Sequence, residues 1–235
     1  MIDTLKKIHK TVYINAIQIR KAPKNGMPKL NLKRLVNGNE KLDKSILIFD
    51  LLAGTELKVC NQNCFKCYAI QSQKQYIYSY MFRYMNTILA KTNTNILSDL
   101  ITKQINSAKS KNVIRIHSSG DFFSQEYIDM WDRIIKQFPM KKFYSYTKRL
   151  DDFDYTSIQS NKNFNLINSV VSLDGQTTIN YGDTDHIKML SENGYFVCPA
   201  TKHNWKGMCG KDCNYCVTNK NVCFHLHYSG QSRKK

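Results

Sequence analysis

The stretch SILIFDLLAGTELKVCNQNCFKCYA (residues 45–69) joins a short apolar run, suited to a buried β-strand, to a loop with three cysteines. Further segments with strand character follow at 113–117 (VIRIH), 142–147 (KFYSYT), 166–173 (LINSVVSL) and 195–198 (YFVC). Helical patterns lie between most of them, at 76–90, 98–108, 124–138 (capped by Ser124) and 183–191. Strands that alternate with helices form parallel sheets, and five strands are too few for a closed eight-stranded barrel. The sequence therefore predicts an α/β fold, a partial parallel (β/α) barrel over residues 45–197.

Basic segments flank the predicted barrel. Thirty-five Lys and Arg against 18 Asp and Glu give a net charge of +17, and the two ends of the chain supply most of it. Basic surfaces attract polyanions, so we expect a nucleic acid or nucleotide as partner; a surface that only maintains solubility is the alternative. We divide the chain into a basic N-terminal segment (1–44), the barrel (45–197) and a cysteine-rich metal-binding extension (198–235). No apolar run approaches the roughly 18 residues that cross a bilayer, and no secretory signal is recognisable, which favours the cytoplasm and no membrane partner.

Eight cysteines in a chain expected in a reducing compartment indicate metal binding rather than disulfides. The first cysteine group has C-x₃-C-x₂-C spacing and consists of Cys60, Cys64 and Cys67. Three thiolates on one loop can hold three corners of a 4Fe–4S cluster and leave one iron open; a zinc site completed from a distant segment is the alternative. The second cysteine group consists of Cys198, Cys209, Cys213, Cys216 and Cys223. It has more thiols than one tetrahedral site needs, and it could hold zinc or an auxiliary iron–sulfur cluster.

Polar residues follow the predicted strands, and sites in parallel sheets form at the carboxyl ends of strands. Asp121 is a candidate cofactor ligand or nucleophile, with stabilisation of its own turn as the alternative role. His117 is equally suited to a ligand and to a buried core histidine, and Lys148 to a phosphate or carboxylate contact. Arg83 and Asn86, one helical turn apart, are expected on a solvated helix face, with a cofactor contact as the alternative.

The order and spacing of these motifs resemble the radical S-adenosylmethionine enzymes, a superfamily of partial (β/α) barrels. The resemblance implies that the first cysteine group holds a 4Fe–4S cluster, although Lys66 stands where an aromatic residue is common. It also implies that the turn of Ser119, Gly120 and Asp121 binds the methionine amino group of S-adenosylmethionine, with one glycine and the usual glutamate altered. The segment VVSLDG (170–175) is similar to the superfamily's fourth strand, which implies cofactor contacts for two more residues, Ser172 and Asp174.

A narrower resemblance is to the phage gene-product-88 proteins. It is carried by the blocks LLAGTELKVCNQNCFKCYA, RIHSSGDFFSQEYIDMW, FYSYTKR and the ending C…C…CNYC…NVCFHLH, which spread over residues 45–227. The resemblance implies a phage context and a metal site made by the second cysteine group without Cys223.

The leading prediction is a radical S-adenosylmethionine-type iron–sulfur enzyme that modifies a nucleic acid or nucleotide. Its open iron would bind the cofactor, and one electron from a donor protein would release a deoxyadenosyl radical that abstracts hydrogen from the substrate. Two alternatives remain: a zinc-stapled base-exchange transferase of the queuine type with Asp121 as nucleophile, and a non-enzymatic metal-bound module that binds nucleic acid.

Overall fold

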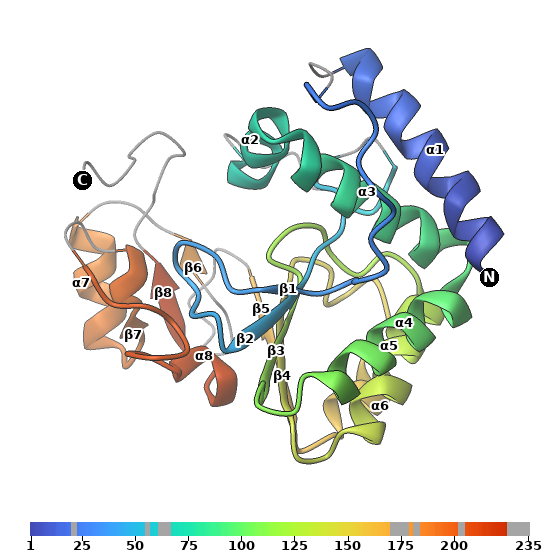
Figure 1. The fold of residues 1–235 in the computed structure, drawn as a ribbon. Coiled ribbons are helices and arrows are strands. Elements are labelled where there is room, and N and C mark those ends of the chain that lie inside the picture. Colours follow the sequence, from blue (N-terminus) through green and yellow to red (C-terminus); the bar gives the residue numbers. More distant parts are fainter. Residues whose placement is uncertain are drawn as a thin grey trace.

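A five-stranded, mostly parallel sheet forms the centre of the molecule (Figure 1). The computed structural model describes residues 1–19, 23–54, 57–60, 67–169, 179–180, 184–201 and 205–224. The strands, in spatial order, are β1 (Val36–Asn37), β2 (Ile46–Phe49), β3 (Val113–Ile116), β4 (Lys142–Thr147) and β5 (Phe164–Asn168). Only β1 runs antiparallel to its neighbour; the pairs from β2 to β5 are parallel. The predicted α/β class and parallel sheet are confirmed.

Three helices cover one face of this sheet: α4 (Thr94–Ser107), α5 (Gln125–Gln137) and α6 (Thr156–Gln159) (Figure 1). Alternate strand residues such as Phe49 and Ile116 point to this side, and they join the main core together with Trp131 of α5. The predicted cap of α5 is confirmed, because the Ser124 side chain accepts a hydrogen bond from the Tyr127 backbone nitrogen at 3.3 Å. The apolar stripe of each helix therefore faces the sheet, as its 3.6-residue period requires.

The N-terminal segment contributes a long helix to the same core. Helix α1 (Ile2–Ile19) packs on α3 (Ile77–Thr92), which follows α2 (Tyr68–Gln75). Leu5, Val12 and Ala16 of α1 are buried, at spacings of seven and four residues that mark one helical face. The sequence analysis described this segment only by its charge, and the apolar face was the signal it missed.

The C-terminal elements form a second, smaller sheet. Its strands are β6 (Ile179–Asn180), β8 (Val222–Phe224) and β7 (Phe196–Val197), all parallel, and its helices are α7 (Thr184–Glu192), the 3₁₀ turn η1 (Pro199–Thr201) and α8 (Tyr215–Thr218). The prediction that 195–198 is the fifth strand of the barrel sheet was wrong. That strand pairs instead with β8, a strand in the extension that the sequence analysis did not expect.

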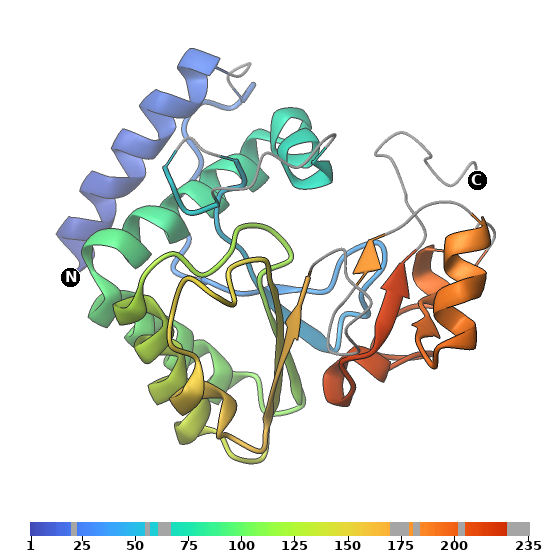
Figure 2. The same ribbon diagram turned by 180° about the vertical axis from the view of Figure 1, so that it is seen from behind.

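The C-terminal elements lie on the side of the main sheet opposite to α4, α5 and α6, as both views show (Figures 1 and 2). Helix α8 packs directly on β4 and β5. The main sheet is thus covered on both faces, by helices on one side and by the extension on the other. Among the described helices, none combines the length and the apolar character that a membrane crossing requires.

Candidate active-site cavity

The carboxyl ends of β2 and β3 are joined by a buried carboxylate. Asp50, the residue after β2, accepts hydrogen bonds from the backbone nitrogens of Ser118 at 2.8 Å and Ser119 at 3.0 Å, and from the Ser118 hydroxyl at 2.7 Å. Arg83 of α3 forms a buried ion pair with the same carboxylate at 3.2 Å. Asp50 therefore fixes the turn after β3 against β2 and α3. Sequence analysis missed it, although a single acid at the end of an apolar strand was a visible signal.

Helix α3 is turned toward this carboxylate, which corrects one expectation. Arg83 is 9% exposed and Asn86 is fully buried, so the predicted solvated face was wrong. The Asn86 side-chain amide donates to the Asp50 backbone carbonyl at 2.9 Å and accepts from the Arg34 guanidinium at 3.1 Å. The polar groups of both residues are hydrogen-bonded inside the protein, so the two side chains hold the end of β2 in place.

The turn after β3 is built for close packing. His117 and Gly120 have positive φ values of 64° and 83°. A Cβ atom on Gly120 would stand 2.6 Å from the Cβ of Leu51, so a side chain has no room there. The hydroxyl of Ser119 is buried and has no hydrogen-bond partner among the described residues. An unsatisfied hydroxyl at this place is available to a ligand.

Asp121 connects the ends of β3 and β4. One oxygen accepts from the Phe122 backbone nitrogen at 2.8 Å and the Thr147 hydroxyl at 2.8 Å, and the other accepts from the Lys148 backbone nitrogen at 2.9 Å. Burial raises the pKa of Asp121, and these hydrogen bonds counteract the rise. The carboxylate thus positions the turn that it belongs to, and it also contributes to the cavity wall.

His117 lies in an aromatic setting. Its Nε2 is 2.8 Å from the Tyr127 hydroxyl, and its ring contacts those of Tyr127 and Phe122. Burial, assisted by the charge of Arg115, lowers the pKa of His117 to about 3, so the ring is neutral at physiological pH. Its Nδ1 has no partner among the described residues. A neutral imidazole of this kind can bind a ligand but carries no proton to donate from a charged form.

The first cysteine group is described in part. Cys60 and Cys67 both contribute to the cavity wall, and α2 begins directly after Cys67. Cys64 lies outside the described residues, as do Ser172 and Asp174. The two described cysteines of this group therefore line the same cavity as the turn after β3.

The second cysteine group separates into four cysteines that share one environment and one that does not. Burial first, and then the mutual repulsion of the thiolates, raises the pKa of Cys198 to about 12 and that of Cys216 to about 11. Cys209 and Cys213 act on both of them electrostatically and are joined to each other by a backbone bridge. In contrast, Cys223 is buried in an apolar cluster of α7, and its thiol lies 3.7 Å from the Phe196 carbonyl.

The thiols of this group fit a thiophilic metal, because a bound cation would offset both the burial and the mutual repulsion that raise these pKa values. As the side chains stand, no three His, Cys, Asp or Glu residues of the described part of the chain are close enough together to hold a metal ion. The observation that favours a metal is therefore the shared environment of the four thiols.

The extension that contains these cysteines packs on the face of the main sheet opposite to α4, α5 and α6 (Figure 1). The Arg115 guanidinium carbon lies 5.9 Å and 5.2 Å from the ring centroids of Tyr144 and Tyr146. Tyr146 is also within hydrogen-bonding reach of the Cys216 side chain. From β5, the Asn165 amide donates to the Cys216 carbonyl at 3.0 Å. Tyr144 and Tyr146, which line the cavity, thus also lie against the extension.

A single cavity of about 2190 Å³ collects most of these residues. Its wall includes the following predicted site residues: Cys60, Cys67, His117, Ser119, Gly120, Asp121, Lys148, Cys198, Cys209, Cys213 and Cys216. The two cysteine groups, which are far apart in the sequence, therefore line one cavity, and this cavity also includes the carboxyl ends of β2, β3 and β4. This is the place where α/β sheets bind their ligands.

Two proteins of mycobacteriophages are similar to this chain. The sequence model of the family "Gene product 88" matches residues 29–231. The Gene 88 protein of Mycobacterium phage L5 is 29% identical over 150 residues, which cover 55% of this chain and 62% of the relative. The Gene 88 protein of phage D29 is 32% identical over 73 residues, 31% of this chain and 30% of the relative. The matches thus span less than two thirds of each relative, and no solved structure matches. Because the family match covers most of the chain, the protein belongs to the Gene product 88 family.

Proposed function

We propose that this protein is an iron–sulfur enzyme of the radical S-adenosylmethionine type that modifies a nucleic acid or nucleotide during phage infection, in the host cytoplasm. The observation that carries the proposal is the cavity, because it brings both cysteine groups and the turn after β3 to one space. Strands β2 to β5 would be the partial (β/α) barrel of such an enzyme, and residues 198–235 its metal-binding extension.

Cys60, Cys64 and Cys67 would hold the 4Fe–4S cluster, and the second cysteine group without Cys223 would hold an auxiliary cluster or zinc. When bound, the first cluster supplies the one-electron chemistry that activates S-adenosylmethionine, with the electron taken from a donor protein. The chain's own part is positioning. The Asp50–Arg83 pair fixes the turn after β3, and the unsatisfied Ser119 hydroxyl on that turn is available to a polar group of the cofactor.

The base-exchange alternative has weaker support. It requires the Asp121 carboxylate to attack a sugar carbon, but three hydrogen bonds from protein groups already engage its oxygens. A nucleophile stabilised in this way is less reactive, whereas a positioning carboxylate benefits. Lys148, whose side chain reaches the cavity, can contact substrate phosphate in either reaction.

The test is a metal analysis of protein purified without oxygen. We expect about four irons and four sulfides or more per chain, and a spectrum of the reduced protein that changes when S-adenosylmethionine is added. Cys64→Ala should lose the cofactor-sensitive signal, whereas Cys223→Ala, the matched control outside the shared thiol environment, should retain it. Zinc alone, without sulfide or visible absorption, would refute the proposal and leave the metal-bound binding module.

A further inference from the structure

Much of the cavity wall comes from parts of the chain without acidic residues. Residues 4–39, 57–98 and 193–211 contain no Asp or Glu, and they supply most of α1, all of α2 and α3, and the segment around Cys198. Among the described residues that line the cavity, seven are Lys or Arg and three are Asp or Glu. The described lining of the cavity is therefore net positive.

Two of the three acids are already engaged inside the protein. Asp50 is paired with Arg83, and Asp121 accepts three hydrogen bonds from its own neighbourhood. Other positive side chains that line the cavity, such as the exposed Lys206 and the half-buried Lys148, are consequently not neutralised by these carboxylates. An excess of cations around a concave site attracts a polyanion.

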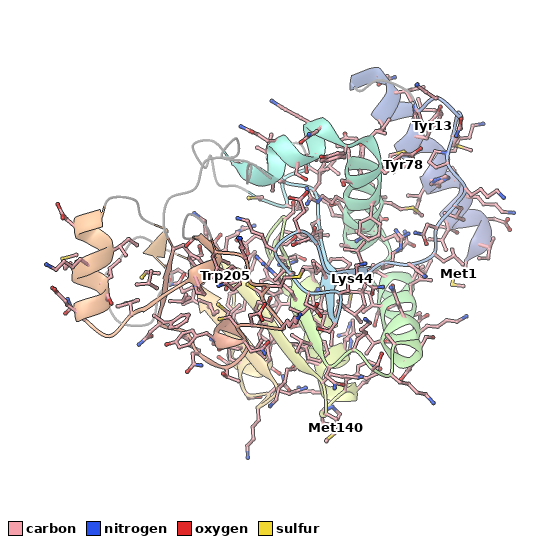
Figure 3. The ribbon with its side chains drawn as sticks, turned by 60° about the vertical axis from the view of Figure 1, so that its left-hand side comes forward. Met1, Tyr13, Lys44, Tyr78, Met140 and Trp205 are labelled. Carbon is pink, nitrogen blue, oxygen red and sulfur yellow. The ribbon has the colours of Figure 1, made fainter. Side chains whose placement is uncertain are left out.

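Exposed aromatic rings line the same cavity. Tyr76 and Tyr78, at the junction of α2 and α3, are 53% and 58% exposed and line the cavity. They are the only aromatic residues among the exposed large apolar side chains of the part of the chain that the structure describes. Figure 3 shows Tyr78 beside α2 and α3, with Met140 at the opposite end of the sheet. Exposed rings of this kind can stack on a planar ligand whose two faces are apolar.

We propose that this cavity binds single-stranded nucleic acid, with bases stacked on Tyr76 and Tyr78 and phosphates in contact with Lys148 and Lys206. The combination of stacking rings and a cationic groove is the way proteins bind single strands without reading their sequence. A duplex satisfies the charge equally well, but its stacked bases cannot cover the rings. This inference deepens the proposed function by naming its substrate class; it rests on that function for the reaction only, since binding needs no turnover.

The experiment is fluorescence anisotropy with the full-length chain and labelled oligonucleotides of about 12 nucleotides. Three probes are compared: single-stranded DNA, single-stranded RNA and the matching DNA duplex. Tyr76→Ala and Tyr78→Ala should each weaken single-strand binding about tenfold. Tyr76→Phe and Tyr78→Phe, which keep the rings, should bind like the unmodified protein.

A second measurement tests the phosphate contacts. Lys148→Ala should reduce the slope of log affinity against log salt by about one. Lys162→Ala is the matched control, because Lys162 is exposed at the end of the sheet away from the cavity, and it should leave the slope unchanged. The two single-strand probes decide between DNA and RNA as the source of the strand.

Three results would overturn the inference: no binding to any probe, alanine variants that bind like the unmodified protein, or a duplex bound as tightly as a single strand. Each of these is independent of metal content. A protein that binds single strands through its tyrosines but contains only zinc would refute the proposed enzyme and support the binding surface. An iron–sulfur protein that does not bind single strands would support the proposed enzyme and refute the single-stranded substrate.

Discussion

Replacing Gly120 by alanine tests whether packing against β2 dictates the shape of the turn after β3. Alanine at a φ of 83° costs about 1–2 kcal/mol relative to glycine, wherever the residue lies. At Gly120 the new methyl group also meets the Leu51 Cβ at 2.6 Å, and such overpacking in a dense core costs typically another 1–3 kcal/mol. The Gly120→Ala variant should therefore lose about 2–5 kcal/mol of unfolding free energy.

Gly194 provides the matched control. Its φ of 82° is nearly the same, but a Cβ there meets nothing within 4 Å. Gly194→Ala should therefore lose only the backbone contribution of about 1–2 kcal/mol. Urea unfolding followed by tryptophan fluorescence gives both numbers, because Trp131 is fully buried in the main core. Equal losses in the two variants would refute the reasoning, since they would show that the Leu51 contact is not limiting.

Further predictions concern the buried charge, the neutral histidine and the extension. Asp50→Asn leaves a buried guanidinium without its counter-charge and should lower the unfolding free energy by about 3–5 kcal/mol in urea titrations; a loss below about 1 kcal/mol contradicts the assigned role. The pKa of His117 is about 3 when folded and about 6.5 when exposed, so the unfolded chain binds more protons between these values. Stability should then fall as the pH drops through this range, by up to about 1.4 kcal/mol per pH unit, and His117→Phe should flatten the slope; a slope that does not change would show that other groups cause it. Asn165→Ala removes hydrogen bonds to the Cys216 and Asn219 carbonyls and should increase hydrogen exchange in residues 205–224 but not in α5; uniform exchange would argue against a local role.

The parallel sheet was predictable from sequence because its signals are local. The apolar run at 46–49 and the alternation at 113–116 fix strand faces, and the cap at Ser124 marks the start of a helix. The motif residues also follow from order alone, since the carboxyl ends of parallel strands meet at one edge. For this reason the sequence predicts that Ser119, Asp121 and Lys148 lie at one edge of the sheet, and all three line the cavity.

What the sequence did not reveal depends on contacts between distant segments. The polar pair of Arg83 and Asn86 resembles a solvated helix face until Asp50 is placed against it. Likewise, the strand at 196–197 pairs with β8 because of a partner some two dozen residues away that has no strand pattern of its own. The expectation that Cys223 is not a metal ligand came from the resemblance only. The apolar surroundings of Cys223 depend on the packing of α7, which the sequence does not show.

The attachment of the extension has a consequence for synthesis on the ribosome. The backbone nitrogen of Cys209 donates to the Lys41 carbonyl, and that of Asp43 donates to the Cys209 carbonyl, so the last part of the chain closes over one of the first. Until residues 205–224 have left the ribosome, the inner face of the sheet, with Ile46 and Ile48, has no cover. Contacts between such distant segments form late and slowly. A nascent chain stalled before Cys209 would thus present an apolar surface to chaperones, and release of the final segment would be the event that ends this exposure.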